Sequence, residues 1–538
     1  MTAPQAFPTR QYSYRRGPTL EAFDLPVGFE VVPGGIYRFH MGRDATPVRI
    51  SPDDVRATLH DPFARLVLVR QRSANTLQEL LAVVRDADVE ADRLVRQRVF
   101  VVADGGQIPW TPETAALERT FRFVLVLSAA EGEPVVYVST TPPFDSSQAF
   151  LQVIGWDPVN GAYQFYDRRG GAWAWAGSSW EALDPDCRGL GPFDSHINGS
   201  INMKELQVPW LHWHSMSAGI RDEVLAPADP LRADPIWKSR ENAELLERDI
   251  VRPGISRWQD ARFASCVKNG TLTRVPEFIR QVVGTSTVNI AASPVASRTI
   301  TASQRVPLPL SFFLDAALMD DLGLDPGIAA VPTVSGAAYL HTLSKYDVHT
   351  TDGELRFPGD THFAFPVPEP AFEDTLVLRS LLRTGVFSDK LAASLLMVDF
   401  PNPVFSPRRT ALGTYAPETA TSGAASDFPA RFVGAIEKAA HDLPADSAEH
   451  EFLANWSLAA NRWRPAFEAR LAAYFAALAP RLEDPVQFEP LFELADSRRR
   501  EFRRRPLHEF KLTTPVSNIP FDAPLLQLRE DARVTTKT

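Results

Sequence analysis

The spacing of apolar residues changes near residue 180, and this change limits the folds open to the chain. Before it, short runs rich in branched and aromatic residues alternate with turn residues, as in β-strands; these runs lie at 99–102, 121–127, 135–139, 150–156 and 162–166. After it, apolar residues recur at helical spacing, at 239–251, 275–283, 373–399, 427–443, 446–474 and 487–505. We therefore predict the α+β class, with a β-rich N-terminal half and a mostly helical C-terminal half.

Turn residues join several of these strands into hairpins. Residues 131–134 carry Gly and Pro, and residues 157–161 end in Asn-Gly, a strong hairpin turn. An apolar run at 66–69 predicts one more strand, and Asn75 followed by Gln78 predicts the capped start of a helix. Residues 1–50 are expected to form an extended arm that ends in the apolar segment 36–40.

Length and charge bound the organisation and the partners. A chain of 538 residues exceeds one simple core, and we divide it into a β-rich region 1–180, a mixed region 181–370 with the candidate site, and a helical region 371–538. The net charge of −10 argues against a nucleic-acid partner. No run approaches the roughly 18 apolar residues of a membrane span, so we expect no membrane partner. The expected partner is a small-molecule substrate.

The two cysteines, Cys187 and Cys266, point to a reducing compartment. We expect both to be free thiols and the protein to be cytoplasmic, since the first residues also lack an apolar run of signal-peptide length. CxxC and CxxCH are both absent, so the sequence offers neither a cysteine-rich zinc site nor a covalent haem attachment. GxGxxG and GxxxxGK[ST] are absent too, which leaves nucleotide binding without support.

Three of the eleven histidines lie within nineteen residues, at His196, His212 and His214. On a strand, His212 and His214 would share one face, and His196 would complete a three-nitrogen site with open positions. Imidazole suits iron, copper and zinc alike. The alternative is a set of histidines that are hydrogen-bonded within a core.

Tryptophans cluster around the same histidines. Trp210 and Trp213 are the two closest in sequence, and bulky aromatics can wall a flat cofactor or simply fill a large core. Arg408 offers an anion contact, for example to a haem propionate, or a surface charge. The arginines at 498–500 have the same two interpretations, and we expect them to form a solvated helix end, where cations suit the helix dipole.

Several short sequence segments resemble parts of large bacterial proteins related to cytochrome c. They are Asn202-Met-Lys-Glu-Leu206, Pro209-Trp210, His212-Trp213-His214-Ser215, parts of 246–262, and Val398-Asp-Phe-Pro-Asn-Pro-Val-Phe-Ser406 with Arg408 and Arg409. In that family a similar stretch follows a CxxCH motif. Here Pro192-Phe193-Asp194-Ser195-His196 stands in its place, with the histidine kept and both cysteines absent.

The resemblance implies haem b held non-covalently through His196, with Trp210, Trp213 and Arg408 around it. A haem iron with an open sixth position suits dioxygen or peroxide chemistry. We therefore expect an oxygenase or peroxidase acting on a small organic molecule, with His212 and His214 as catalytic acid–base groups. The alternatives are a non-haem iron or other metal enzyme using all three histidines, and a non-catalytic binding or scaffold protein.

Overall fold

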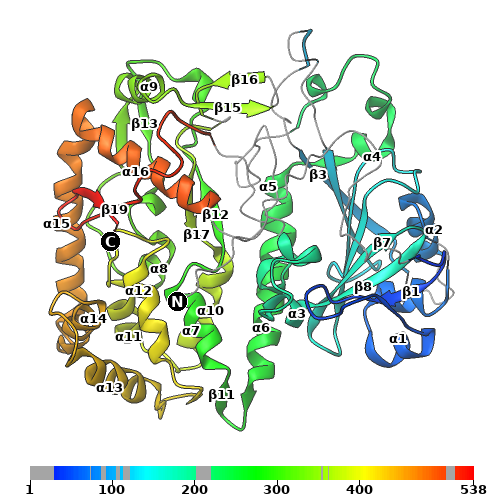
Figure 1. Cartoon of the computed structure of the whole chain (residues 1–538), viewed down its shortest axis with the longest axis horizontal. Coiled ribbons are helices and arrows are strands. Elements are labelled where there is room, and N and C mark those ends of the chain that lie inside the picture. The colour runs from blue at the N-terminus through cyan, green and yellow to red at the C-terminus, as the bar shows by residue number, and fades with distance from the viewer. Residues whose placement is uncertain are drawn as a thin grey trace.

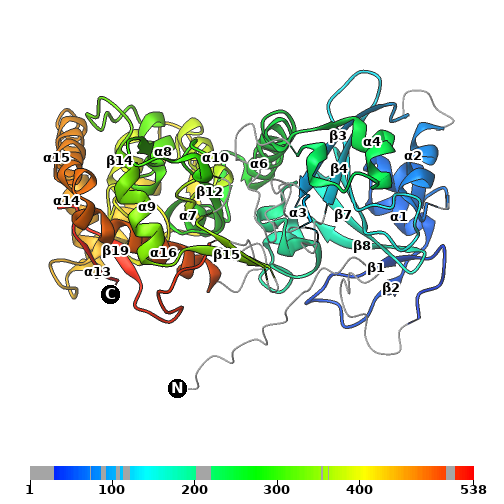
Figure 2. The ribbon, with the colours of Figure 1, turned by 90° about the horizontal axis from the view of Figure 1, so that it is seen from above.

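The structure is a computed structural model, and it describes residues 30–72, 74–86, 93–103, 110–112, 115, 121–201, 220–352, 355–360, 363–504 and 515–537. Two lobes lie side by side (Figures 1 and 2). The sheet lobe is formed by the described residues within 30–251, and the helical lobe by those within 275–537. The long helix α6 (Arg252–Cys266) runs between them. The predicted α+β class is confirmed.

A nine-stranded sheet organises the sheet lobe among the described residues. Its order is β2-β1-β8-β7-β6-β5-β4-β3-β9, with β3 to β8 as a continuous antiparallel meander and β1 and β9 added in parallel at its two ends. The strands are β1 (Ile36–Arg38), β2 (Val48–Arg49), β3 (Arg96–Ala103), β4 (Phe121–Ser128), β5 (Val136–Thr140), β6 (Leu151–Asp157), β7 (Ala162–Arg169), β8 (Ala172–Ser178) and β9 (Arg240–Glu241). Both predicted hairpins, β4–β5 and β6–β7, are confirmed.

Side-chain alternation along the strands makes two cores, one on each face of the sheet. On β4, Phe123 and Leu125 enter one core while Val124 and Val126 enter the other. The first core is covered by α1 (Pro52–Thr58), α2 (Leu77–Arg85) and α4 (Pro235–Lys238). The second is covered by α3 (Ser179–Leu183), α5 (Ala243–Leu246) and α6, and it also receives residues of the helical lobe. The two lobes are therefore joined by packed apolar side chains.

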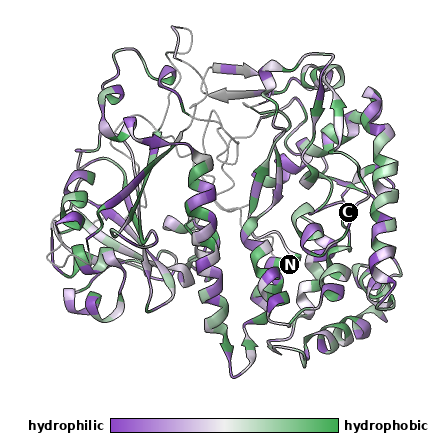
Figure 3. Cartoon of the chain, turned by 180° about the vertical axis from the view of Figure 1, so that it is seen from behind, coloured by the Kyte–Doolittle hydropathy of each residue, from purple (hydrophilic) through white to green (hydrophobic). Residues whose placement is uncertain are grey.

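The helix predicted at 239–251 starts later and ends fifteen residues further on. The chain passes from α5 through a π-helical turn (Glu247–Val251) directly into α6. Pro253 is the second residue of α6, directly after the π-helical turn, and the helix continues through it. Figure 3 shows hydrophilic and hydrophobic residues side by side along α6, and the buried ones include Ile255 and Trp258.

Helices dominate the other lobe. They are α7 (Val275–Val283), α8 (Ala316–Asp321), α9 (Gly336–Lys345), α10 (Phe372–Arg383), α11 (Asp389–Leu396), α12 (Pro407–Ala411), α13 (Phe428–Ala440), α14 (Ala448–Ser457), α15 (Trp463–Glu483) and α16 (Pro485–Arg503). Short strands pair between them: β10 (Val267–Lys268), β11 (Thr271–Thr273) and β18 (Thr419–Thr421); β12 (Val288–Ala291) with β17 (Val367–Pro370); β13 (Arg305–Pro307) with β14 (Thr333–Ser335); β15 (His349–Asp352) with β16 (Leu355–Pro358); and β19 (Leu526–Leu528) with β20 (Val534–Thr536). The helical run predicted at 373–399 forms two helices, α10 and α11, and Gly385 between them has a φ of +68°.

Three predicted elements differ from the structure in kind or extent. Residues 66–68 belong to a π-helix (Ala64–Leu68), with Val69 as its C-cap, rather than to a strand. The single helix predicted over 446–474 is two helices, since α14 ends at Ser457 and α15 begins at Trp463. Pro465 lies in the first turn of α15, where a proline is tolerated. The helix predicted from Asn75 is capped one residue later, by Thr76 with Glu79.

The arginines at 498–500 are buried, so the predicted solvated helix end is wrong. Arg498, Arg499 and Arg500 are 3%, 2% and 2% exposed. Each donates to backbone carbonyls of distant loops, Arg498 to Phe312 and Pro401, Arg499 to Pro366, and Arg500 to Ala523. Asp496, which is fully buried, also pairs with Arg500 at 2.8 Å. These cations serve packing and hydrogen bonding inside the helical lobe.

Both cysteines are free, as predicted, and both are buried. No helix in the described part of the chain combines the length and the apolar character needed to cross a membrane. Residues 1–29 of the predicted arm lie outside the described residues.

Candidate functional site

His196 lies in a tight loop between two 3₁₀ turns, Gly191–Asp194 and Ile197–Gly199. Asn198 and Gly199 both take left-handed backbone angles, with φ of +70° and +72°, which Asn and Gly tolerate best. Two hydrogen bonds of 2.7 Å fix their carbonyl groups: Ser179 Oγ donates to Gly199, and Trp258 Nε1 donates to Asn198. The loop that presents His196 is therefore held by both α3 and α6.

The ring of His196 is buried against the second core of the sheet. The residue is 2% exposed, and its ring centroid lies 5.4 Å from that of Phe165. It lines a cavity of about 30 Å³ between the sheet and the helices before α6. The rest of the described lining is mostly apolar: Val124, Tyr137, Val138, Ser139, Gln152, Ile154, Ile201, Leu246, Ile250 and Val251.

The other residues predicted for this site cannot be placed beside His196. His212, His214, Trp210 and Trp213 lie outside the described residues. Of the described tryptophans in the same stretch, Trp173 packs in the core on the opposite face of the sheet, and Trp180 packs on Trp258 at 5.2 Å. Within the described ranges, no three His, Cys, Asp or Glu side chains come together as a metal site.

The space beside His196 tests the two predicted cofactors. One water molecule needs a cavity of roughly 10 Å³ or slightly more. The cavity of about 30 Å³ beside His196 therefore has room for very few atoms, and a porphyrin does not fit between the described residues. A single metal ion with one or two small ligands does fit, and a neutral imidazole is the commonest protein ligand for such an ion.

Arg408 lies elsewhere, on α12, and the structure does not bring it into the cavity of His196. Its Nη2 atom pairs with Glu451 at 2.9 Å, and its Nη1 atom donates to the carbonyl of Asp446 at 2.7 Å. It lines an open groove of about 410 Å³ in the helical lobe. The predicted propionate contact for a haem on His196 therefore has no geometric basis among the described residues.

That groove is formed by four segments far apart in the sequence. They are the loop after α11, the stretch that leads into α14 with its first turns, one face of α15, and the end of β19 with the turn after it; α12 adds Arg408. The lining residues are Asp399, Pro401, Arg408, Ala445, Asp446, Ser447, His450, Glu451, Ala454, Arg470, Leu528, Arg529 and Glu530. Asp399 has a φ of +51°, a conformation uncommon outside Gly, Asn and Asp. The segment 398–409 can be recognised in the sequence. The groove cannot be predicted from the sequence, because its other walls come from distant segments.

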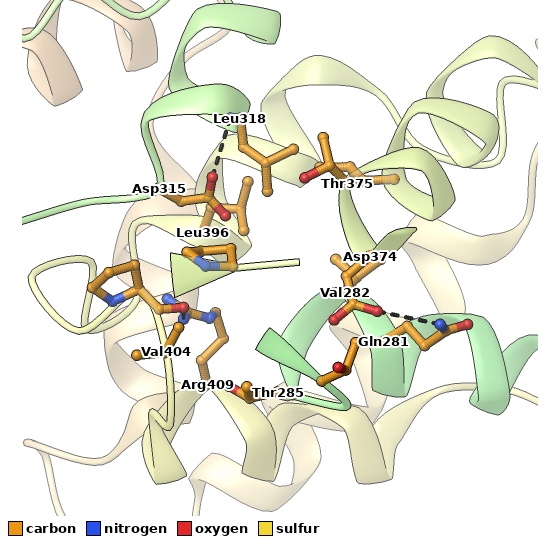
Figure 4. Close-up of a pocket in the computed structure, with 15 residues that line it drawn as sticks. Gln281, Val282, Thr285, Asp315, Leu318, Asp374, Thr375, Leu396, Val404 and Arg409 are labelled. Carbon is orange, nitrogen blue, oxygen red and sulfur yellow. Dashed lines mark hydrogen bonds between the residues drawn. The ribbon is translucent and has the colours of Figure 1, made fainter. Parts of the chain in front are cut away.

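A second, smaller cavity of about 20 Å³ lies between α7, α8 and α10 (Figure 4). Asp315 accepts a hydrogen bond from the Leu318 amide as the N-cap of α8, and Gln281 Nε2 donates to Asp374 at 3.2 Å. Desolvation raises the pKa of Asp315 to about 6. The cavity holds about one water molecule, so it has no room for an organic substrate. Asp315, Gln281 and Asp374 there have partners within the protein.

Comparisons with protein-family models, with curated proteins and with solved structures find no match for this chain.

Proposed function

We propose that the chain is a metal-dependent oxidoreductase that acts on a small organic molecule through a non-haem iron centre at His196. His212 and His214 are the proposed second and third ligands, which gives a three-histidine site with open positions. The single observation that carries the proposal is the placement of His196. It is a buried imidazole, in a loop with left-handed backbone angles, at the wall of a mostly apolar cavity.

The chemistry of this placement favours a metal ligand. His196 lies among apolar side chains such as Ile154 and Ile250, and imidazole is the commonest metal-binding side chain of proteins. The Asn198 and Gly199 carbonyls are held from two helices, which limits the movement of the loop that carries the ring. A ligand fixed in this way is pre-organised for its metal.

The iron would supply the redox chemistry and a binding position for dioxygen or peroxide. The described residues would do the rest. Val124, Ile154 and Val251 exclude water, which strengthens electrostatic interactions in the site. Ser139 and Gln152 are polar residues of the described lining, with a hydroxyl and an amide side chain.

Haem remains the competing cofactor, implied by the resemblance to cytochrome c-related proteins. His196 would bind its iron, and the haem would need more room than the described residues leave beside that ring. We also propose a cytoplasmic location, which the two buried free thiols support.

The test is metal and haem content in the purified full-length protein. We expect about one iron per chain and no haem absorption band. His196→Ala, His212→Ala and His214→Ala should each lose most of the iron, because removing one of three ligands leaves too few donors. His40→Ala is the matched control, since His40 is also a buried histidine (7% exposed), packed on Trp175.

Each result has a defined consequence. A haem band that disappears only in His196→Ala would overturn the three-histidine site in favour of haem. A protein without stoichiometric metal or haem would overturn both and leave the non-catalytic binding protein. Loss of iron in His40→Ala to the same degree would show that any buried-histidine change disturbs the fold.

A further inference from the structure

We propose that the groove between α12, α14, α15 and the β19–β20 turn is a separate binding site for a small zwitterion. Such a ligand carries one carboxylate and one ammonium group, as a free amino acid does. The site is independent of the proposed iron centre, and its residues come from the helical lobe alone.

The groove has the size of a small-molecule site. At about 410 Å³ it exceeds the cavities beside His196 and Asp315, of about 30 Å³ and 20 Å³. Typical ligand sites have volumes of several hundred Å³. Nine of its thirteen lining residues have polar or charged side chains, and Pro401, Ala445, Ala454 and Leu528 are the apolar members.

A network of ion pairs fixes the floor and one wall. Glu451 lies between two arginines, 2.9 Å from Arg408 and 3.6 Å from Arg470, and its Oε1 atom accepts from the Asp399 amide at 3.1 Å. Arg470 also pairs with Glu530. The positive-φ backbone at Asp399 is held by this same carboxylate, so the network keeps the groove in one shape before any ligand binds.

Two hydrogen bonds hold the partly buried carboxylate of Asp399. It accepts from Asn402 Nδ2 at 2.7 Å and from Ser406 Oγ at 2.6 Å. Asn402 in turn bonds the backbone of Leu528 in both directions, at 2.9 Å and 3.0 Å. These hydrogen bonds connect the segment 398–406 to β19, so the β19–β20 turn lies at the groove.

Three charges of the groove join no ion pair among the described residues. One is Asp399, whose carboxylate is hydrogen-bonded to Asn402 and Ser406. The other two, Arg529 and Asp446, are of opposite sign. The side chain of Arg529 donates a hydrogen bond to Thr535 at 3.2 Å but joins no ion pair. The carboxylate of Asp446 has neither a hydrogen bond nor an ion pair, and only the carbonyl of that residue is used, by Arg408. Both residues are exposed at the groove.

These charges decide the ligand class. The lining holds three arginines and four acidic residues, a formal balance of −1 with His450 neutral, so it attracts neither a polyanion nor a polycation strongly. A zwitterion instead pairs its carboxylate with Arg529 and its ammonium group with Asp446. His450, whose Nδ1 lies 3.1 Å from Ser447 Oγ, adds a polar contact from the first turn of α14.

The experiment is calorimetric titration of the full-length protein with ω-amino acids of increasing length: glycine, γ-aminobutyrate and 6-aminohexanoate. Acetate and ethylammonium are the single-charge controls. We expect saturable binding of at least one zwitterion and none of the single-charge probes. Asp446→Asn and Arg529→Gln should each weaken binding at least about tenfold, the effect of losing one charge-assisted contact.

Matched controls are Asp442→Asn and Lys438→Gln, which change exposed charges on and just after α13 that do not line the groove. They should leave binding unchanged. The proposal is overturned if the single-charge probes bind equally well, if the groove variants bind like wild type, or if no zwitterion binds at millimolar concentration. Each outcome is independent of iron content, so it does not depend on the fate of the proposed metal site.

Discussion

Replacing Gly199 by alanine should destabilise the protein far more than the same change at Gly270. Both glycines have nearly equal left-handed backbone angles, with φ of +72° and +75°. A side chain at either position therefore costs about 1–2 kcal/mol of backbone strain. They differ in their surroundings. A Cβ at Gly199 would lie 2.4 Å from the carbonyl oxygen and 2.7 Å from the Cα of Ser179, whereas no atom lies within 4 Å at Gly270.

The close approach at Gly199 cannot be relieved by a side-chain rotation, because both nearest atoms belong to the backbone of α3. Overpacking of this kind adds about 1–3 kcal/mol. We therefore expect Gly199→Ala to lose about 2–5 kcal/mol of unfolding free energy and Gly270→Ala about 1–2 kcal/mol. Urea unfolding of both variants, followed by tryptophan fluorescence, measures the difference.

The Gly199 variant should also disturb the candidate site. Moving this backbone away from Ser179 lengthens the 2.7 Å hydrogen bond to its carbonyl and shifts the loop that carries His196. We expect reduced iron content in Gly199→Ala and wild-type content in Gly270→Ala. Equal destabilisation by the two variants would refute the close approach as the reason for glycine at 199.

Two further predictions concern buried ionisable groups. Burial raises the pKa of Asp61 to about 6 from 3.8, so the folded state holds more protons than the unfolded chain between these pH values. The free energy of unfolding should therefore fall by up to about 3 kcal/mol as the pH rises from about 4 to about 6. Urea unfolding at several pH values should show a smaller dependence of this free energy on pH in Asp61→Asn. Arg498→Met should lower the free energy of unfolding by about 2–4 kcal/mol, because it leaves two backbone carbonyls without their donor in the core. In the same assay, Arg504→Met, which changes an exposed arginine, should lower it by less than about 1 kcal/mol. Equal losses in the two variants would contradict this account.

The strands are predictable because their evidence is local. Alternation along 121–127 or 150–156 follows directly from the two-residue period of a strand, and a Gly- or Asn-containing turn fixes the hairpin. The run at 66–69 is misassigned because four apolar residues fit a strand and a buried helix equally well. Its helical start is marked earlier, by Asp61, whose carboxylate accepts from the Ala64 amide at 3.1 Å.

The sites are less predictable, because each depends on segments distant in sequence. The clustering of histidines draws attention to His196, and the structure does bury it beside a cavity. Arg408 stands out through the family resemblance, yet its surroundings come from α14, some forty residues later. No periodicity or motif indicates that Arg529 and Asp446 line one groove, since only the tertiary fold brings them together.

The buried arginines and the many prolines of this chain have one common explanation. The 45 prolines each lack a backbone N–H donor and interrupt regular pairing, so the loops carry carbonyl groups without backbone partners. An arginine supplies five N–H donors and no acceptor. Arg409 donates to the carbonyls of Asn402 and Pro403 at 3.0 Å and 2.9 Å, and Arg498 and Arg499 donate to those of Pro401 and Pro366. A proline-rich loop that must lie inside a protein therefore calls for buried guanidinium groups, and arginines in an otherwise helical segment of such a chain are better interpreted as internal donors than as a surface charge.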